Sequence, residues 1–145
     1  MRRLSIIGVL VGTWLWATVA WATTYAIDPE HTAISFKVRH LFSRVQGTFD
    51  TFEGEFVYVP GKPDVWTVTA TIDTASLNTR LAPRDHHLRS KDFFDVERYP
   101  TITFSSTTVQ EVTPTSGMLE GVLSIHGVER PVVLDLTIHG VGADP

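Results

Sequence analysis

Apolar and polar residues alternate along much of the chain between residues 32 and 139. Strict alternation is typical of β-strands that bury one face and expose the other. It is clearest in four segments, 32–40, 65–73, 118–125 and 132–139. In the first of these, Ile34, Phe36 and Val38 share one face, and polar or charged residues occupy the other. The pattern therefore predicts four half-buried strands.

Weaker alternation fills the intervals between these segments. The stretch 45–59 contains two glycines and is expected to bulge or bend, and the stretch 101–112 fits either one strand or two. Turns are expected where glycine and proline cluster, at 60–63, 114–117 and 127–131. These intervals leave no room for helical crossovers, so we expect antiparallel hairpins.

Residues 75–99 break the β-pattern. Pro83 suits the first turn of a helix, which we expect to run to about Lys91 and to be followed by the aromatic pair Phe93-Phe94. We interpret this segment as an irregular flap with a short helix, packed on one end of the sheet.

These elements define the expected fold class. Some seven antiparallel strands with one apolar face favour closure, because closure removes unpaired edges. The prediction is an all-β antiparallel barrel or sandwich. Barrels of about eight strands have an interior that is either filled by side chains or large enough for one ligand, and the alternation does not choose between the two.

The first residues have the three parts of a secretory signal peptide. Arg2 and Arg3 precede an uncharged apolar stretch, 4–19, which ends at Ala20-Trp21-Ala22. We predict cleavage after Ala22, which makes residues 1–22 a signal peptide and residues 23–145 one domain. The alternative is an uncleaved anchor, for which the apolar stretch is slightly short. We therefore expect a bacterial protein in the periplasm or the secreted fraction, with no stable membrane insertion after cleavage.

Composition narrows the function classes. The formal net charge is −4, and no run of basic residues occurs. This argues against nucleic-acid or anionic-membrane binding, because both need clustered Lys and Arg. The chain has no cysteine, so burial and strand pairing alone must stabilise the domain.

Short motifs in a fixed order resemble those of the YceI-like family of exported bacterial proteins. They are YAIDPEH (25–31), FKVRHL (36–41), GTF (47–49), TIDTAS (71–76), RDHHL (84–88), DFFD (92–95), YPTITFS (99–105) and LSIHGV (123–128). Each motif alone is weak, but together they span the predicted mature chain. The family's domain usually continues beyond the strand that ends near His139. The resemblance therefore implies a barrel that lacks its last strands.

The resemblance implies a lipocalin-like barrel that holds a polyisoprenoid or another long-chain amphiphile in an apolar interior. It implies no catalytic residues, no metal and no cofactor, apart from a bound isoprenoid or quinone-like ligand. The strand faces and the flap place these candidates around the ligand: Phe36, Val38, Phe49, Trp66, Val68, Ile72, Phe94, Phe104, Leu123, Leu134, Arg84 and His87. A homodimer is left open by the sequence.

Several alternatives stand beside this hypothesis. Six histidines invite a metal site, but no His-x-x-x-His or Glu-x-x-His spacing occurs. Arg84 and Asp85 either brace the flap by hydrogen bonds, which we favour, or Arg84 or His87 meets the polar head of the lipid. A Gly-x-Ser-x-Gly elbow and paired catalytic carboxylates are missing, which argues against an enzyme. A quinone-linked redox or stress accessory protein, and a solid-core β-domain without ligand, remain as further functions.

Overall fold

A computed structural model describes residues 22–40, 43–140 and 142. The predicted signal peptide therefore lies outside the described residues, apart from its last residue. The described strands are β1 (Thr23–Ala26), β2 (Ile34–His40), β3 (Ser43–Phe49), β4 (Phe52–Tyr58), β5 (Thr67–Asp73), β6 (Leu77–Asn78), β7 (Thr101–Gln110), β8 (Ser116–Ile125) and β9 (Val128–Thr137). One helix, α1 (Ala82–Arg89), and two short 3₁₀ turns, Pro63–Val65 and Thr74–Ser76, complete the elements.

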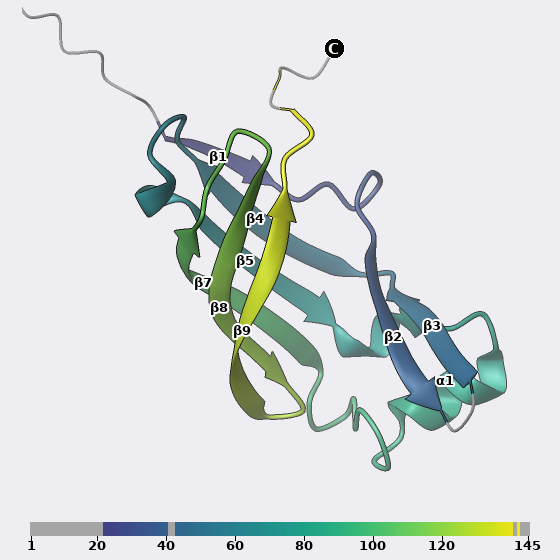
Figure 1. Cartoon of the computed structure of the whole chain (residues 1–145). Helices are drawn as coiled ribbons and strands as arrows, with labels where there is room; N and C mark the ends of the chain where they lie inside the picture. Colours follow the sequence, from purple (N-terminus) through teal and green to yellow (C-terminus); the bar gives the residue numbers. More distant parts are fainter. Residues whose placement is uncertain (1–21, 41–42, 141, 143–145) are drawn as a thin grey trace, which may run out of the picture.

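The strands form two antiparallel sheets (Figure 1). The larger sheet has the order β1-β4-β5-β7-β8-β9, and the smaller one has the order β2-β3-β6. The β-rich, antiparallel class predicted from the sequence is confirmed. In the described residues, however, neither β9 nor β2 pairs with a second neighbour, so the sheet is not closed into a barrel.

The helical flap also agrees with the prediction. The α1 helix begins at Ala82, has Pro83 in its first turn and ends at Arg89. Proline is suited to this place because the first helical N–H groups have no partner within the helix.

The structure corrects one predicted feature and resolves another that the sequence left open. The stretch 45–59 is two strands rather than one bulged strand, because the chain leaves the small sheet at Asp50 and enters the large one at Phe52. The stretch 101–112 is one strand that ends at Gln110, with a register shift between Ser106 and Thr108.

The predicted turn at 127–131 is also wrong. The turn is the pair His126-Gly127, both with positive φ, and β9 begins directly at Val128. In a two-residue hairpin, every second residue of a strand directs its backbone N–H and C=O toward the partner strand. The residues between them direct these groups toward the free edge. Counted from the Ile125–Val128 pair, Pro131 belongs to the second set. Its missing N–H therefore removes no hydrogen bond to β8, and the strand can pass through it.

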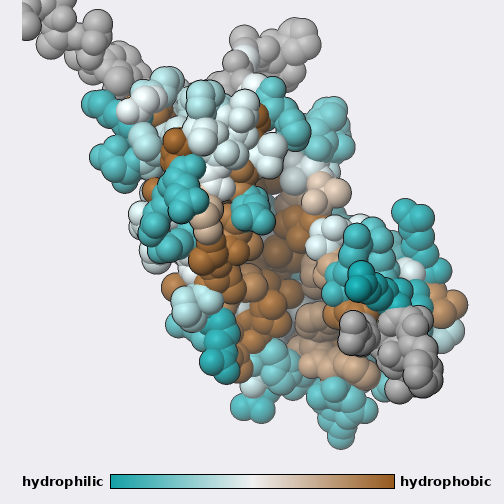
Figure 2. Space-filling model, in the orientation of Figure 1, coloured by the Kyte–Doolittle hydropathy of each residue, from teal (hydrophilic) through white to brown (hydrophobic). Residues whose placement is uncertain are grey.

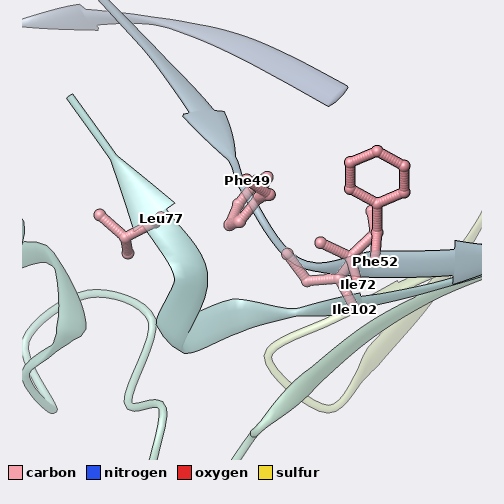
Figure 3. Close-up of a cluster of buried hydrophobic side chains, with 5 residues drawn as sticks. All are labelled: Phe49, Phe52, Ile72, Leu77 and Ile102. Atoms are coloured by element: carbon pink, nitrogen blue, oxygen red, sulfur yellow. The ribbon is translucent and has the colours of Figure 1, made fainter. Parts of the chain in front are cut away.

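Buried apolar side chains form two clusters. The first consists of Phe49, Phe52, Ile72, Leu77 and Ile102 and lies where the two sheets meet (Figure 3). The second consists of Trp66, Phe104, Val109 and Leu119, within the large sheet. Leu123 packs against both clusters. The two clusters therefore form one continuous apolar layer on the inner face.

Candidate ligand-binding groove

The strand register defines which residues face the interior. Paired residues on antiparallel strands share a face, and successive residues alternate. Leu119 is buried in the interior with 5% of its surface exposed, and its partner on β9 is Leu134. Leu134 therefore lies on the same inner face, yet 43% of its surface is exposed. The inner face is thus covered at β8 and uncovered at β9.

The uncovered region follows β9 along its length. Val128 lies on the same face and has 50% of its surface exposed, although its partner Ile125 packs against the first cluster. Figure 2 shows apolar surface, in brown, in the hollow between β9 and the β2–β3 hairpin. We call this region, lined by the inner faces of β8, β9 and β2, the open groove.

The groove leads into a pocket at the end of the sheet remote from the flap. The pocket has a volume of about 490 Å³ and is lined by Tyr25, Phe56, Tyr58, Leu136, Thr137, Ile138, His139, Gly140 and Gly142. These residues come from β1, β4, β9 and the segment after β9. Since β1 and β9 are the two edges of the large sheet, the sheet curls until both edges line one pocket.

Aromatic rings line this pocket and the interior behind it. The Tyr58 and Trp66 ring centroids lie 4.8 Å apart, and Phe56 lies 6.1 Å from Trp66. The indole N–H of Trp66 donates to the Val59 carbonyl at 2.8 Å, which satisfies its polar atom in the buried site. The wall is therefore apolar and preorganised.

A second aromatic group lies at the flap end. The ring centroids of Phe36 and Phe49 are 5.1 Å apart, and Phe94 from the flap lies 6.0 Å from Phe49 and 6.4 Å from Phe36. Gly47 lies against the Phe36 ring, where a Cβ atom would approach Cζ to 2.5 Å. The aromatic packing between the small sheet and the flap closes this end of the groove.

Hydrogen bonds to buried polar atoms hold the flap in place. Asp85, with 7% of its surface exposed, accepts from the Thr79 backbone N–H at 2.9 Å and from the Thr79 hydroxyl at 2.5 Å. Arg84 donates from Nε to the same hydroxyl at 2.7 Å and from Nη2 to the Thr79 carbonyl at 2.8 Å. Arg89 donates to the carbonyls of Ala75 and Leu77. The three side chains tie α1 to the segment around β6.

Most of the predicted ligand-binding residues fall on this inner face. Buried or partly buried in the two clusters are Phe36, Phe49, Trp66, Val68, Ile72, Phe94, Phe104 and Leu123. Leu134 and Val38 occupy inner-face register positions but are exposed.

The two polar candidates lie elsewhere. Arg84 donates its hydrogen bonds to Thr79, as flap bracing requires. His87 is exposed on α1, with its ring centroid 4.8 Å from that of Phe93. The structure brings neither residue to the open groove by a described contact, and their contact with a ligand stays a prediction.

Sequence reasoning missed part of the site. Leu77 is fully buried at the flap end, in a segment interpreted as irregular. Tyr25 and Tyr58 of the pocket were also missed, although alternation along 52–58 places Tyr58 on the face of Phe52 and Phe56. This alternation was the sequence pattern that could have identified Tyr58 as an inner-face residue. No local signal marks the two-residue strand at Leu77.

In the described part of the chain, no cluster of three or more His, Asp or Glu side chains could hold a metal ion. No helix in those same residues is long and apolar enough to cross a membrane.

A curled antiparallel sheet with an apolar inner face and a helical flap defines a lipocalin-like β-protein. Within that class, the chain belongs to the YceI-like family, since the model of the YceI-like domain matches residues 25–144.

Relatives and solved structures agree with this assignment. A UPF0312 protein of Pseudomonas savastanoi pv. phaseolicola is 39% identical over 149 residues, which cover 100% of this chain and 78% of that protein. A UPF0312 protein of Vibrio cholerae is 43% identical over 129 residues, which cover 86% of this chain and 67% of that protein. The crystal structure of Burkholderia cenocepacia BcnA matches with a TM-score of 0.76 and 25% identity, over 81% of this chain and 74% of that one. The Campylobacter jejuni YCEI protein matches with a TM-score of 0.66 and 35% identity, over 81% and 70%.

Proposed function

We propose that this protein is an exported carrier that binds a polyisoprenoid or another long-chain amphiphile in the open groove, without transforming it. The observation that carries the proposal is the exposure of Leu134 and Val128 on the inner face, opposite buried or partly buried apolar partners. An apolar wall of this kind is normally covered by protein or by ligand. Membership of the YceI-like family supports a lipid as the ligand.

The groove has the shape that a flexible chain needs. It runs from the aromatic cluster at Phe36 and Phe49 to the pocket at Tyr25 and Tyr58, with a continuous apolar layer behind it. At about 25 cal/mol per Å², covering on the order of 300 Å² of apolar surface contributes about 7 kcal/mol, before the cost of ordering the ligand. This supports retention of an insoluble chain at low concentration.

Binding rather than catalysis is supported by the chemistry of the inner face. The register places no Asp or Glu on the inner face of any described strand. A carboxylate that could act as general acid or base on the ligand is therefore not positioned on these strands, and the groups with that capacity at the pocket are His139, Tyr25 and Tyr58.

Export is part of the same proposal. The first strand begins at Thr23, the residue that follows the predicted cleavage point. We expect the protein in the periplasmic fraction of a Gram-negative host, with an intact mass that begins at Thr23. A cytoplasmic protein that retains Met1–Ala22 would contradict this part.

The binding test uses two neighbouring positions on β9. Leu134 faces the groove, and Val133 faces outward with 53% of its surface exposed. The full chain is expressed in bacteria, purified without detergent and extracted with organic solvent, and the extract is analysed by mass spectrometry. We expect a stoichiometric long-chain amphiphile in the wild type and in Val133→Glu, and a strongly reduced amount in Leu134→Glu.

The matched pair separates groove binding from adventitious lipid. Both substitutions place a carboxylate on the same edge strand, so a general loss of folding would affect both, as circular dichroism would show. A folded wild type without lipid, which also fails to take up added long-chain amphiphiles, would exclude the carrier function and favour a solid-core domain.

A further inference from the structure

We propose that Arg130 on β9 binds the anionic head of the amphiphile, a carboxylate or a phosphate, while the apolar tail lies in the open groove. This inference rests on the proposed carrier function and specifies the ligand class. It concerns a residue outside the flap, where the polar candidates had been expected.

The register places Arg130 on the inner face. Arg130 pairs with Leu123 of β8, which packs against both apolar clusters. Its neighbours on the same face of β9 are Val128 and Val132. The adjacent residue, Glu129, pairs with Ser124 and occupies the opposite face. A guanidinium group therefore projects from the apolar side of the sheet.

Arg130 is unique in this respect among the described strands. Every other Asp, Glu, Lys or Arg of these strands whose side chain the structure describes has an outer-face register position: Lys37, Arg44, Glu53, Glu55, Asp73, Glu120, Glu129 and Asp135. Alternation alone would place an apolar residue at position 130. Arg130 is exposed at the uncovered edge of the inner face, and a ligand tail that covers this face would withdraw the guanidinium from water at a cost that a head of opposite charge would offset.

The described part of the chain contains no internal partner for this cation. The ion pair found there joins Asp28 and His31, and no carboxylate lies within ion-pairing distance of Arg130. The flap arginines differ, since Arg84 and Arg89 donate to Thr79 and to backbone carbonyls. Arg130 therefore keeps its paired N–H donors for a planar or tetrahedral oxyanion, which guanidinium binds in bidentate geometry.

Charge and position together determine how the ligand would lie. The chain carries a net charge of −4, so its overall field repels anions, and any preference for them must be local. Arg130 lies on the edge strand β9 at the level of Leu123, where the two clusters meet. The head would leave through the open side of the groove and remain hydrated, and the tail would lie on the apolar layer.

The test compares ligands that share a tail and differ in charge. Binding of cis-parinaric acid and of its methyl ester is measured by fluorescence on delipidated full-length protein, at low salt. Hexadecyl phosphate, palmitate and hexadecanol then compete for the same site. The variants are Arg130→Gln, Arg130→Lys and, as an outer-face control, Arg44→Gln.

We expect the wild type and Arg44→Gln to bind the acid about 10-fold more tightly than the ester, which corresponds to about 1.4 kcal/mol. Arg130→Gln should reduce this ratio to about 1 while the ester affinity stays unchanged, and Arg130→Lys should retain part of the ratio. Stronger competition by hexadecyl phosphate than by palmitate would show that the site prefers a phosphate head, and the reverse order would show that it prefers a carboxylate.

Two outcomes would overturn the inference, in distinguishable ways. Tight binding of ester and acid with equal affinity in the wild type, or an unchanged ratio in Arg130→Gln, would exclude the anion site and leave the carrier function in place. Failure of every probe to bind the folded wild type would exclude both.

Discussion

The flap end and the β9 side of the molecule are opposites: the flap has irregular backbone but buried side chains, whereas β9 has regular backbone but exposed side chains. The flap is irregular apart from α1, yet Asp85 and Leu77 are buried there, and arginine side chains cross-link its segments. The β9 strand is long and regularly paired with β8, yet Val128 and Leu134 on its inner face expose about half of their surfaces. The flap is thus held by internal partners, and the inner face of β9 is not.

This difference separates the region that is held by internal hydrogen bonds from the region where we propose that the ligand binds. Buried polar atoms of an irregular loop must find hydrogen-bond partners within the chain, and the flap side chains provide them. The backbone N–H and C=O groups of a strand form hydrogen bonds with the neighbouring strand. Its side chains are therefore not needed for this purpose and can remain exposed. The site for a ligand is therefore expected on the regular, uncovered strand rather than in the braced loop.

The largest expected effect contrasts the two leucines that face each other across β8 and β9. Leu119→Ala should lower the free energy of unfolding by about 2–5 kcal/mol, because it leaves a cavity in the second cluster. Leu134→Ala should cost less than about 1 kcal/mol in delipidated protein, because its side chain already contacts solvent. Urea denaturation of both variants measures the difference. Equal losses would mean that the β9 side is covered in solution.

A smaller effect is expected from the flap. Asp85→Ala leaves the Thr79 N–H and hydroxyl without their acceptor in a buried site, which should cost about 1–3 kcal/mol. Asp92→Ala, an exposed position in the same flap, serves as the control and should leave stability within about 0.5 kcal/mol of the wild type. Thermal denaturation reports both. If Asp85→Ala matched the control, hydrogen bonding would not be what holds the flap.

The smallest expected effect lies at the break between β3 and β4. Hydrogen bonds from Asn78 and then Thr48 hold the pKa of Asp50 below its ordinary value. A carboxylate with a lowered folded-state pKa stabilises the protein above its unfolded-state pKa, and that contribution is lost as pH falls through the folded-state value. Asp50 is exposed, so Asp50→Asn should cost less than about 1 kcal/mol at pH 7.

The pH dependence provides the check on Asp50. The stability difference between wild type and Asp50→Asn should shrink as pH is lowered from 5 toward 3, measured by urea denaturation at each pH. A difference that stays constant over this range would show that the charge of Asp50 contributes nothing.

Much of the fold follows from the sequence because alternation is a local property. The period of two along β2, β5 and β8 is set by side chains two residues apart, and Pro83 marks the start of α1. The β9 strand was predicted only from residue 132, because Gly127 and Pro131 together indicated one turn over residues 127–131. Which way the nitrogen of Pro131 points depends on the hairpin register, and local composition does not contain that information.

Only the tertiary structure decided which apolar residues are covered. The sequence by itself determined a cysteine-free antiparallel β-protein with one apolar face, a helical flap and the motifs of its family. It did not distinguish Leu119 from Leu134, which are the same residue type and each lie on the apolar face of their own strand. Nor did it show that Arg84 donates its hydrogen bonds to Thr79, while Arg130 projects from the inner face. Burial and pairing depend on strands distant in sequence, so the groove emerges only once the two sheets are placed in space.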